Sequence, residues 1–222
     1  MKICIPILSK NKQEFLEDMK IIQKEPYDWI EWRIDCMESD IFEVASLLRM
    51  TFSCPIIATI RTEGNSSFHI DYVGLYKQLI DTKCMDYIDV EVKKDSQDLI
   101  EYAHSHGIRV IGSYHNFDAG LSRAEMIELY EMMKEKHMDM YKFAASPKTK
   151  EEVVEQLLTT YELFMDTQDS FISICMNEIG KISRIIGGLF GSFLTFACAN
   201  KKSAPGQIPA TLLKEAIDIL HL

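Results

Sequence analysis

Short apolar runs alternate along the chain with longer segments in which apolar residues recur at the spacing of an amphipathic helix. The apolar runs have the length and turn-flanked character of buried β-strands. We predict eight strands, at Ile3–Leu8, Trp29–Asp35, Ile56–Arg61, Tyr87–Val92, Val110–His115, Met140–Ala144, Phe171–Met176 and Phe193–Cys198. The segments between them predict eight helices, near residues 11–24, 39–50, 69–83, 95–105, 122–137, 149–165, 178–188 and 209–220.

Strict alternation of strands and helices is typical of an α/β fold with a closed parallel sheet, the (β/α)8 TIM barrel. An open doubly wound sheet is the alternative. That fold usually has a glycine-rich phosphate turn after its first strand, and residues 5–10, IPILSK, contain no glycine. No linker or shift in composition interrupts the chain, so we expect residues 1–222 to form a single barrel domain.

The two faces of several predicted strands differ in polarity. Because side chains alternate along a strand, one face carries the polar residues Glu31, Arg33, Asp35, Thr59, Arg61, Asp89, Glu91, Ser113, His115 and Lys142. Helices must cover the apolar face of a parallel barrel, so we expect the polar face to line the interior. Active sites of this architecture lie at the C-terminal ends of the strands, where several of these residues fall.

The charges expected inside the barrel balance in number. They are four carboxylates and four cations: Glu31, Asp35, Asp89, Glu91, Arg33, Arg61, Lys142 and, near the seventh loop, Arg184. Burial of an unpaired ion is costly, so we expect these groups to pair. For Asp89 alone, a structural salt bridge at the bottom of the barrel is an equally good interpretation.

Lys142 is the most reactive candidate in this set. It has aromatic neighbours and is expected to face Arg33 or Arg61, and both burial and nearby positive charge lower the pKa of an amine. A neutral lysine forms a Schiff base with a ketone and so stabilises a carbanion at the neighbouring carbon. Such chemistry needs a base, and His115, on the same face one strand earlier, has an ordinary pKa of about 6.5 that suits proton transfer.

Composition and charge exclude several classes of protein. Lys and Arg total 24 against 34 Asp and Glu, and the formal charge of −10 argues against nucleic-acid binding. No uninterrupted apolar run reaches the roughly 18 residues of a membrane span, and no secretory signal is evident at the N-terminus. The six cysteines form no C-x-x-C pair and fit reduced core thiols, so we expect a cytoplasmic protein without a metal site.

Six short motifs then appear in order over nearly the whole chain. They are EWRID at 31–35, TIRT at 59–62, SYHNF at 113–117, YKFA at 141–144, the segment 176–184 that ends in Ser183-Arg184, and SAPGQ at 203–207. In this combination the chain resembles the type I 3-dehydroquinate dehydratases. The resemblance implies a (β/α)8 barrel that converts 3-dehydroquinate into 3-dehydroshikimate in the shikimate route to aromatic compounds, with no metal or organic cofactor.

The resemblance also implies roles for particular residues. Lys142 forms the imine with the substrate ketone, while His115 removes the C2 proton and later returns a proton to the departing C1 hydroxyl. Arg184 pairs with the substrate carboxylate, a planar task for a guanidinium. The other expected substrate-binding residues are Glu31, Arg33 and Arg61, which contact hydroxyls and set the charge, and Ser203 and Gln207, which belong to a lid.

Departures from the family pattern change three expectations. Asn116 stands where many members have an aspartate, so Glu91 or another carboxylate is expected to orient His115. The segment after Arg61 is shorter than the usual motif, and Glu63 receives no role. The first predicted strand lies at the start of the given sequence, so we expect the protein to lack the N-terminal hairpin of longer members and to gain stability as a homodimer.

Two other functions remain open at the level of sequence. A class I aldolase would use the same inner lysine, with a phosphate-binding turn for which Gly187, Gly188 and Gly191 are candidates. A ligand-binding barrel could keep these residues without turnover. Borohydride trapping with dehydroquinate or with sugar phosphates distinguishes a dehydratase from an aldolase. Growth of absorbance from the conjugated enone product distinguishes a dehydratase from a ligand-binding barrel without turnover.

Overall fold

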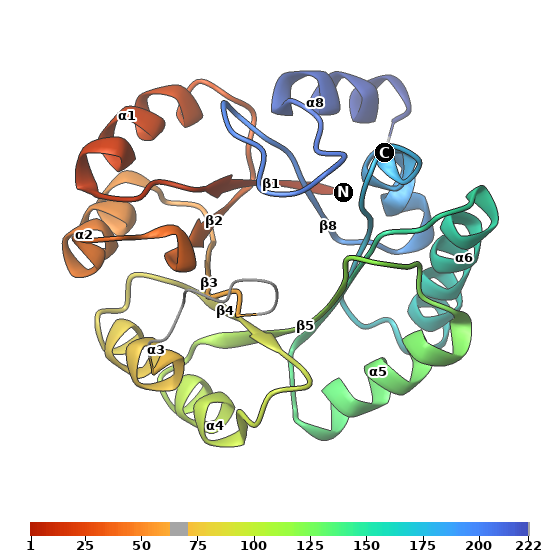
Figure 1. Ribbon diagram of the computed structural model, residues 1–222, viewed down its shortest axis with the longest axis horizontal. Helices are drawn as coiled ribbons and strands as arrows, with labels where there is room; N and C mark the ends of the chain where they lie inside the picture. The colour runs from red at the N-terminus through yellow and green to blue at the C-terminus, as the bar shows by residue number, and fades with distance from the viewer. Residues whose placement is uncertain (63–70, 222) are drawn as a thin grey trace.

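The structure is a computed structural model that describes residues 1–62 and 71–221 (Figure 1). Parallel strands form an inner barrel and the helices surround it as a ring. The strands are β1 (Lys2–Ile7), β2 (Trp29–Arg33), β3 (Ile56–Thr59), β4 (Tyr87–Glu91), β5 (Arg109–Asn116), β6 (Met140–Ala145), β7 (Phe171–Cys175) and β8 (Leu194–Phe196). The helices are α1 (Lys12–Ile22), α2 (Ile41–Thr51), α3 (Tyr72–Asp81), α4 (Gln97–Ser105), α5 (Arg123–Glu135), α6 (Lys150–Thr167), α7 (Lys181–Ile186) and α8 (Ala210–Ile219), with 3-10 turns η1 (Ile34–Cys36) and η2 (Gly187–Phe190).

The strand order establishes a barrel rather than an open doubly wound sheet. The strands follow in the order β7-β6-β5-β4-β3-β2-β1-β8, so that each pairs with its neighbour along the chain and β1 also pairs with β8. The ring closes at Phe171 of β7, whose carbonyl accepts a hydrogen bond from Phe193 N at 2.7 Å and which bridges to Ser192. The prediction of a (β/α)8 barrel is confirmed, and each of the sixteen expected elements has its counterpart within the described residues.

Alternation along the strands separates two apolar layers. Ile30, Trp32 and Ile34 point outward and belong to the main core between the sheet and the helices. A second cluster fills the inside of the barrel and contains Trp29, Ile57, Tyr87, Ile111 and Met140, all near the N-terminal ends of their strands. The apolar interior floor therefore leaves only the C-terminal half of the barrel for polar side chains.

Three aspartates brace that floor. Each precedes an even-numbered strand and accepts a backbone N–H from the start of the strand before it: Asp28 from Ile3 at 2.9 Å, Asp86 from Ile56 at 2.8 Å and Asp139 from Val110 at 2.7 Å. Buried amides at a sheet end need such acceptors. The repeated contact fixes the N-terminal end of the barrel, opposite to the end where the charged residues gather.

Some element boundaries differ from the sequence expectation. β2 ends at Arg33 rather than Asp35, because residues 34–36 turn into η1. α7 is shorter than expected, since Gly180 and Gly187 flank it. The helix expected from residue 69 is seen from Tyr72, and residues 69 and 70 lie outside the described part of the chain. No helix in the described segments is long and apolar enough to cross a membrane, and all six cysteines are unpaired thiols.

Candidate active site

A cavity of about 440 Å³ opens at the C-terminal ends of the barrel strands. Most strands, the turn after β2, α7 and the loop before α8 contribute to it. Its walls are Glu31, Arg33, Asp35, Arg61, His115, Phe117, Lys142, Ala144, Ile174, Met176, Arg184, Phe196, Ser203, Ala204 and Gln207. Every site residue predicted from the sequence is therefore part of one cavity wall.

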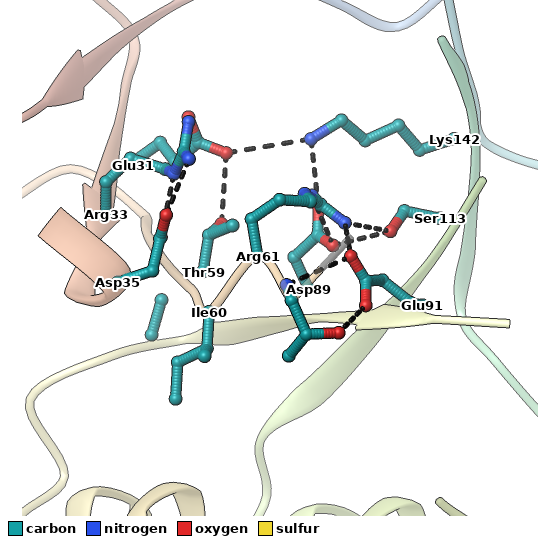
Figure 2. Close-up of polar contacts among 12 residues, drawn as sticks. Glu31, Arg33, Asp35, Thr59, Ile60, Arg61, Asp89, Glu91, Ser113 and Lys142 are labelled. Carbon is teal, nitrogen blue, oxygen red and sulfur yellow. Dashed lines mark hydrogen bonds and ion pairs between the residues drawn. The ribbon is translucent and has the colours of Figure 1, made fainter. Parts of the chain in front are cut away.

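Lys142 lies at the centre of a charged layer, and Figure 2 shows its ammonium between two carboxylates. The Nζ atom is 2.8 Å from Asp89 Oδ2 and 3.6 Å from Glu31 Oε1, and it lies 4.6 Å from the centre of the Phe196 ring. The side chain is 6% exposed. Its nearest charged neighbours are thus carboxylates, whereas the sequence had led us to expect an arginine.

Arg61 makes the second set of contacts in this layer. Its guanidinium donates to Asp89 at 2.9 Å, to Glu91 at 3.1 Å and to the Ser113 hydroxyl at 3.1 Å. The carboxyl of Asp89 is fully buried, which favours its protonated form, but the charges of Arg61 and Lys142 outweigh burial and hold its pKa well below the ordinary value. Asp89 is therefore a fixed anion that links Arg61 and Lys142, two residues of the cavity wall.

A further ion pair lies at the end of β2. Arg33 donates two hydrogen bonds to Asp35, at 2.9 and 2.7 Å, and this planar pairing orients the guanidinium toward the cavity (Figure 2). Glu31 accepts a hydrogen bond from the Thr59 hydroxyl at 3.0 Å. The three lining groups on this side of the cavity, Glu31, Arg33 and Asp35, are therefore each held by at least one hydrogen bond.

His115 lies one layer nearer the cavity mouth than Lys142, because Lys142 is in register with Ser113 and Ala144 with His115. Desolvation, followed by the positive charges of Arg61 and Lys142, lowers the pKa of the imidazole well below 6.5. The ring is therefore neutral at physiological pH, the form that a general base requires. It lies nearly parallel to the Phe117 ring, with 6.0 Å between centroids.

The group expected to orient His115 was Glu91 or another carboxylate. Glu91 accepts hydrogen bonds from Arg61 and Thr62, and His115 Nδ1 is buried without a partner in the described part of the chain. Glu91 and the imidazole share no hydrogen bond among the described residues, so a role of Glu91 in orienting His115 stays a prediction.

Arg184 has no carboxylate partner among residues 1–62 and 71–221. Its guanidinium is 1% exposed and donates only to carbonyl oxygens, those of Phe196 and Pro205, each at 3.1 Å. Its Nε is buried without a partner in the same residues. Burial without an anion lowers the pKa of this arginine to about 10. The charge count from the sequence paired eight groups, whereas the structure pairs seven and leaves Arg184 as a desolvated cation at the cavity.

The segment 203–207 closes one side of the cavity. Gln207 is buried, and its side chain accepts from Ser203 N at 2.7 Å and donates to the Ser203 hydroxyl at 2.8 Å. Gly206 has φ +75°, and a Cβ atom there would lie 2.2 Å from the carbonyl oxygen of Asn177. Only glycine fits this close approach, so the turn in the loop requires Gly206.

Comparison with known proteins decides the family. The sequence model of the type I 3-dehydroquinase family matches residues 3–222. The chain belongs to this family. Curated 3-dehydroquinate dehydratases from Listeria monocytogenes and Clostridioides difficile are each 33% identical to it, over 99% of this chain and 92% of each relative.

Solved structures of other 3-dehydroquinate dehydratases have the same fold. That from Geobacillus kaustophilus matches with a TM-score of 0.94 at 27% identity, covering 99% of this chain and 91% of that one. The type I enzyme from Clostridium difficile with covalently modified comenic acid matches with a TM-score of 0.92 at 32% identity, covering 99% and 92%. The resemblance drawn from the six motifs is confirmed.

In this type I 3-dehydroquinase, the site has some features that could not be assigned from the sequence. Asp89 was left between two interpretations, and alternation alone did not reveal that it contacts both Arg61 and Lys142. Ile174, Met176 and Phe196 complete the apolar wall, and the period-two pattern of their strands could have identified them. Glu63 lies outside the described residues. Lys181, on α7, is not one of the described cavity-lining residues and pairs with Glu178.

Proposed function

We propose that this protein dehydrates 3-dehydroquinate to 3-dehydroshikimate through a Schiff base on Lys142. One observation carries the proposal: of the described residues that line the cavity, Lys142 is the only lysine, and it lies one layer below a histidine whose pKa is lowered. A buried amine beside a neutral base is the minimum needed for imine-assisted proton abstraction.

The reaction can be written with these two groups. His115 accepts a proton from the Lys142 ammonium, and the neutral amine adds to the C3 ketone. Return of that proton to the carbinolamine hydroxyl releases water and leaves a protonated imine. His115 takes the C2 proton, and the C–H electron pair moves into the imine to form an enamine. The enamine electrons then form the C1–C2 double bond as the C1 hydroxyl leaves with a proton from His115, and water hydrolyses the imine to free Lys142. No metal or organic cofactor takes part.

The carboxylates around Lys142 favour the charged stages of this sequence. Asp89 and Glu31 lie 2.8 and 3.6 Å from Nζ, so the protonated imine would form between two negative groups that are already in place. Fixed charges that need no rearrangement stabilise such an intermediate most effectively. The imine nitrogen thereby becomes a better electron sink for the C2 carbanion.

Arg184 is the proposed binding group for the substrate carboxylate. A buried guanidinium without an anionic partner gains most from a planar carboxylate, which accepts two parallel hydrogen bonds. Glu31, Arg33 and Arg61 are proposed to contact the substrate hydroxyls on the opposite wall. Ser203 and Gln207, which are hydrogen-bonded to each other, would close over the bound substrate ring and exclude water.

Borohydride trapping tests the proposal. Protein incubated with 3-dehydroquinate and reduced with borohydride should gain the mass of one substrate or product molecule less one oxygen atom on the peptide that contains Lys142, because imine formation loses water and reduction adds two hydrogens. Untreated protein should generate the absorbance of a conjugated enone. An adduct formed only with sugar phosphates would favour the aldolase alternative. Trapping without enone absorbance would favour a ligand-binding barrel.

The setting of the enzyme is also proposed. Six free thiols agree with a cytoplasmic location, and the reaction itself belongs in the shikimate route to aromatic amino acids. We further propose a homodimer. Light scattering coupled to size exclusion should give about twice the 25.6 kDa chain mass, and a mass of one chain would overturn the dimer.

A further inference from the structure

The loop that closes the cavity is fastened at a second place, away from the cavity itself. This β8–α8 loop comprises residues 199–207, and its two ends are joined because Cys198 N donates to Ile208 O at 3.0 Å and Ala210 N to Cys198 O at 2.9 Å. Figure 1 shows the loop in blue, reaching from the α8 side toward α1. Its cavity-facing half carries Ser203, Ala204 and Gln207.

The outer half of the loop is bound by Asp18 of α1. Asn200 donates to Asp18 Oδ1 at 2.7 Å, and Lys201 lies 3.3 Å from Oδ2. The same Oδ2 accepts a hydrogen bond from the Ser9 hydroxyl, in the β1–α1 loop, at 2.7 Å. One carboxylate therefore joins α1, the loop after β1 and the loop before α8.

The burial of Asp18 makes this contact energetically important. Its side chain is 6% exposed and Ser9 is 1% exposed, so neither group can replace a lost partner freely with water. Asp18 lies on the face of α1 that also buries Phe15, Met19 and Ile22. The carboxylate is thus held by a packed helix and offers the β8–α8 loop a rigid point of attachment.

We propose that Asp18 is a positioning residue that holds the β8–α8 loop closed over the cavity. Asp18 is not one of the described cavity-lining residues, so it acts through the loop rather than on the substrate. This inference rests on the proposed function, in which Ser203 and Gln207 contact substrate. When the closed loop is only partly populated, apparent affinity falls by that fraction, while the chemistry of the closed complex is unchanged.

Two variants test the proposal by kinetics. Asp18→Ala should raise KM by about 5- to 50-fold with kcat within about threefold, because the loop contributes equally to substrate and transition-state binding. Asn200→Ala removes the contact from the loop side, leaves α1 intact and should raise KM by a smaller factor. Unchanged KM in a folded Asn200→Ala variant would overturn the proposal, even if Asp18→Ala does not fold.

Amide hydrogen exchange gives a readout that does not depend on activity. In Asp18→Ala the amides of residues 199–207 should exchange at least about tenfold faster, while those of β4 and β5 keep their protection. Asp86→Ala is the matched control, because Asp86 also accepts from two other elements but lies at the barrel floor. It should lower stability without changing KM or exchange in 199–207.

The two readouts separate the failure of this inference from failure of the proposed function. Wild-type protein without dehydratase activity would overturn the proposed function, and the exchange rates would still test the anchoring. An active enzyme whose loop exchanges at the same rate with and without the Asp18 carboxylate would overturn the anchoring alone.

Discussion

Lys142 on β6 and Asp89 on β4 are separated by strand β5, yet their charged groups are 2.8 Å apart. Ser113 of β5 lies between them in the barrel wall and donates to the same carboxylate at 2.6 Å. The two side chains meet because the wall curves and directs both into the interior. This contact joins the proposed nucleophile to Arg61, which is bound to the other oxygen of Asp89.

Removal of the proposed nucleophile should abolish the reaction. We expect Lys142→Ala to lose both turnover and borohydride trapping, because no other lysine lines the described cavity. Lys181→Ala is the matched control, since Lys181 lies on α7 and pairs with the exposed Glu178. Mass spectrometry of the reduced adduct decides, and an adduct on a peptide with Lys181 but without Lys142 would reverse the assignment.

Removal of the proposed base should separate imine formation from elimination. We expect His115→Ala to lower kcat by roughly 10²–10⁴-fold while substrate is still trapped on Lys142. His104→Ala serves as the control, because His104 lies on α4 and bonds to Asp139 at the barrel floor. Near-normal turnover in His115→Ala would make His115 structural and return the base role to a carboxylate.

Stability should depend on pH through the same histidine. The folded pKa of His115 lies below the unfolded value of about 6.5, so between these values the unfolded chain binds more protons. The contribution of neutral His115 to the free energy of unfolding is fully present above about pH 6.5. As the pH falls below about 6.5, this contribution decreases by up to about 1.4 kcal/mol per pH unit. Urea denaturation at several pH values should show this slope in the parent and a flatter one in His115→Gln; identical slopes would contradict the prediction.

Exchange of the carboxylate-binding group for an ammonium should weaken substrate binding. We expect Arg184→Lys to raise KM by roughly 10-fold or more, because a lysine cannot donate two coplanar hydrogen bonds to a carboxylate. Arg123→Lys, on the exposed Arg123–Glu162 pair, is the control. A variant with the parent's KM and only a lower melting temperature would show that Arg184 braces Phe196 and Pro205 without binding substrate.

Loss of the central anion should destabilise the fold as well as the site. Asp89→Asn leaves Arg61 and Lys142 buried with too little negative charge, and breaking a buried pair of this kind costs about 3–5 kcal/mol. Asp139→Asn, at the half-exposed floor position, should cost less. Chemical denaturation measures both, and equal losses for the two variants would contradict the central role of Asp89.

The sequence alone determined which residues face inward and which elements carry them. Alternation along each strand is a local property of extended backbone, so the inward direction of Glu31, His115 and Lys142 could be predicted before any contact was known. The short motifs added the family and the expected chemistry. Both depend on neighbours within a few residues, which the sequence displays directly.

Tertiary structure alone decided which of these side chains meet. Lys142 pairs with Asp89, Asp18 contacts Asn200, 182 residues away, and Arg184 has no carboxylate partner among residues 1–62 and 71–221. All three outcomes depend on strand register and on closure of the ring between β7 and β8. Register and closure are set by packing of the whole core. The spacing of inward-facing residues along the chain is the same whether two of their side chains are in contact or far apart. Only the closed barrel therefore decides which charged side chains pair.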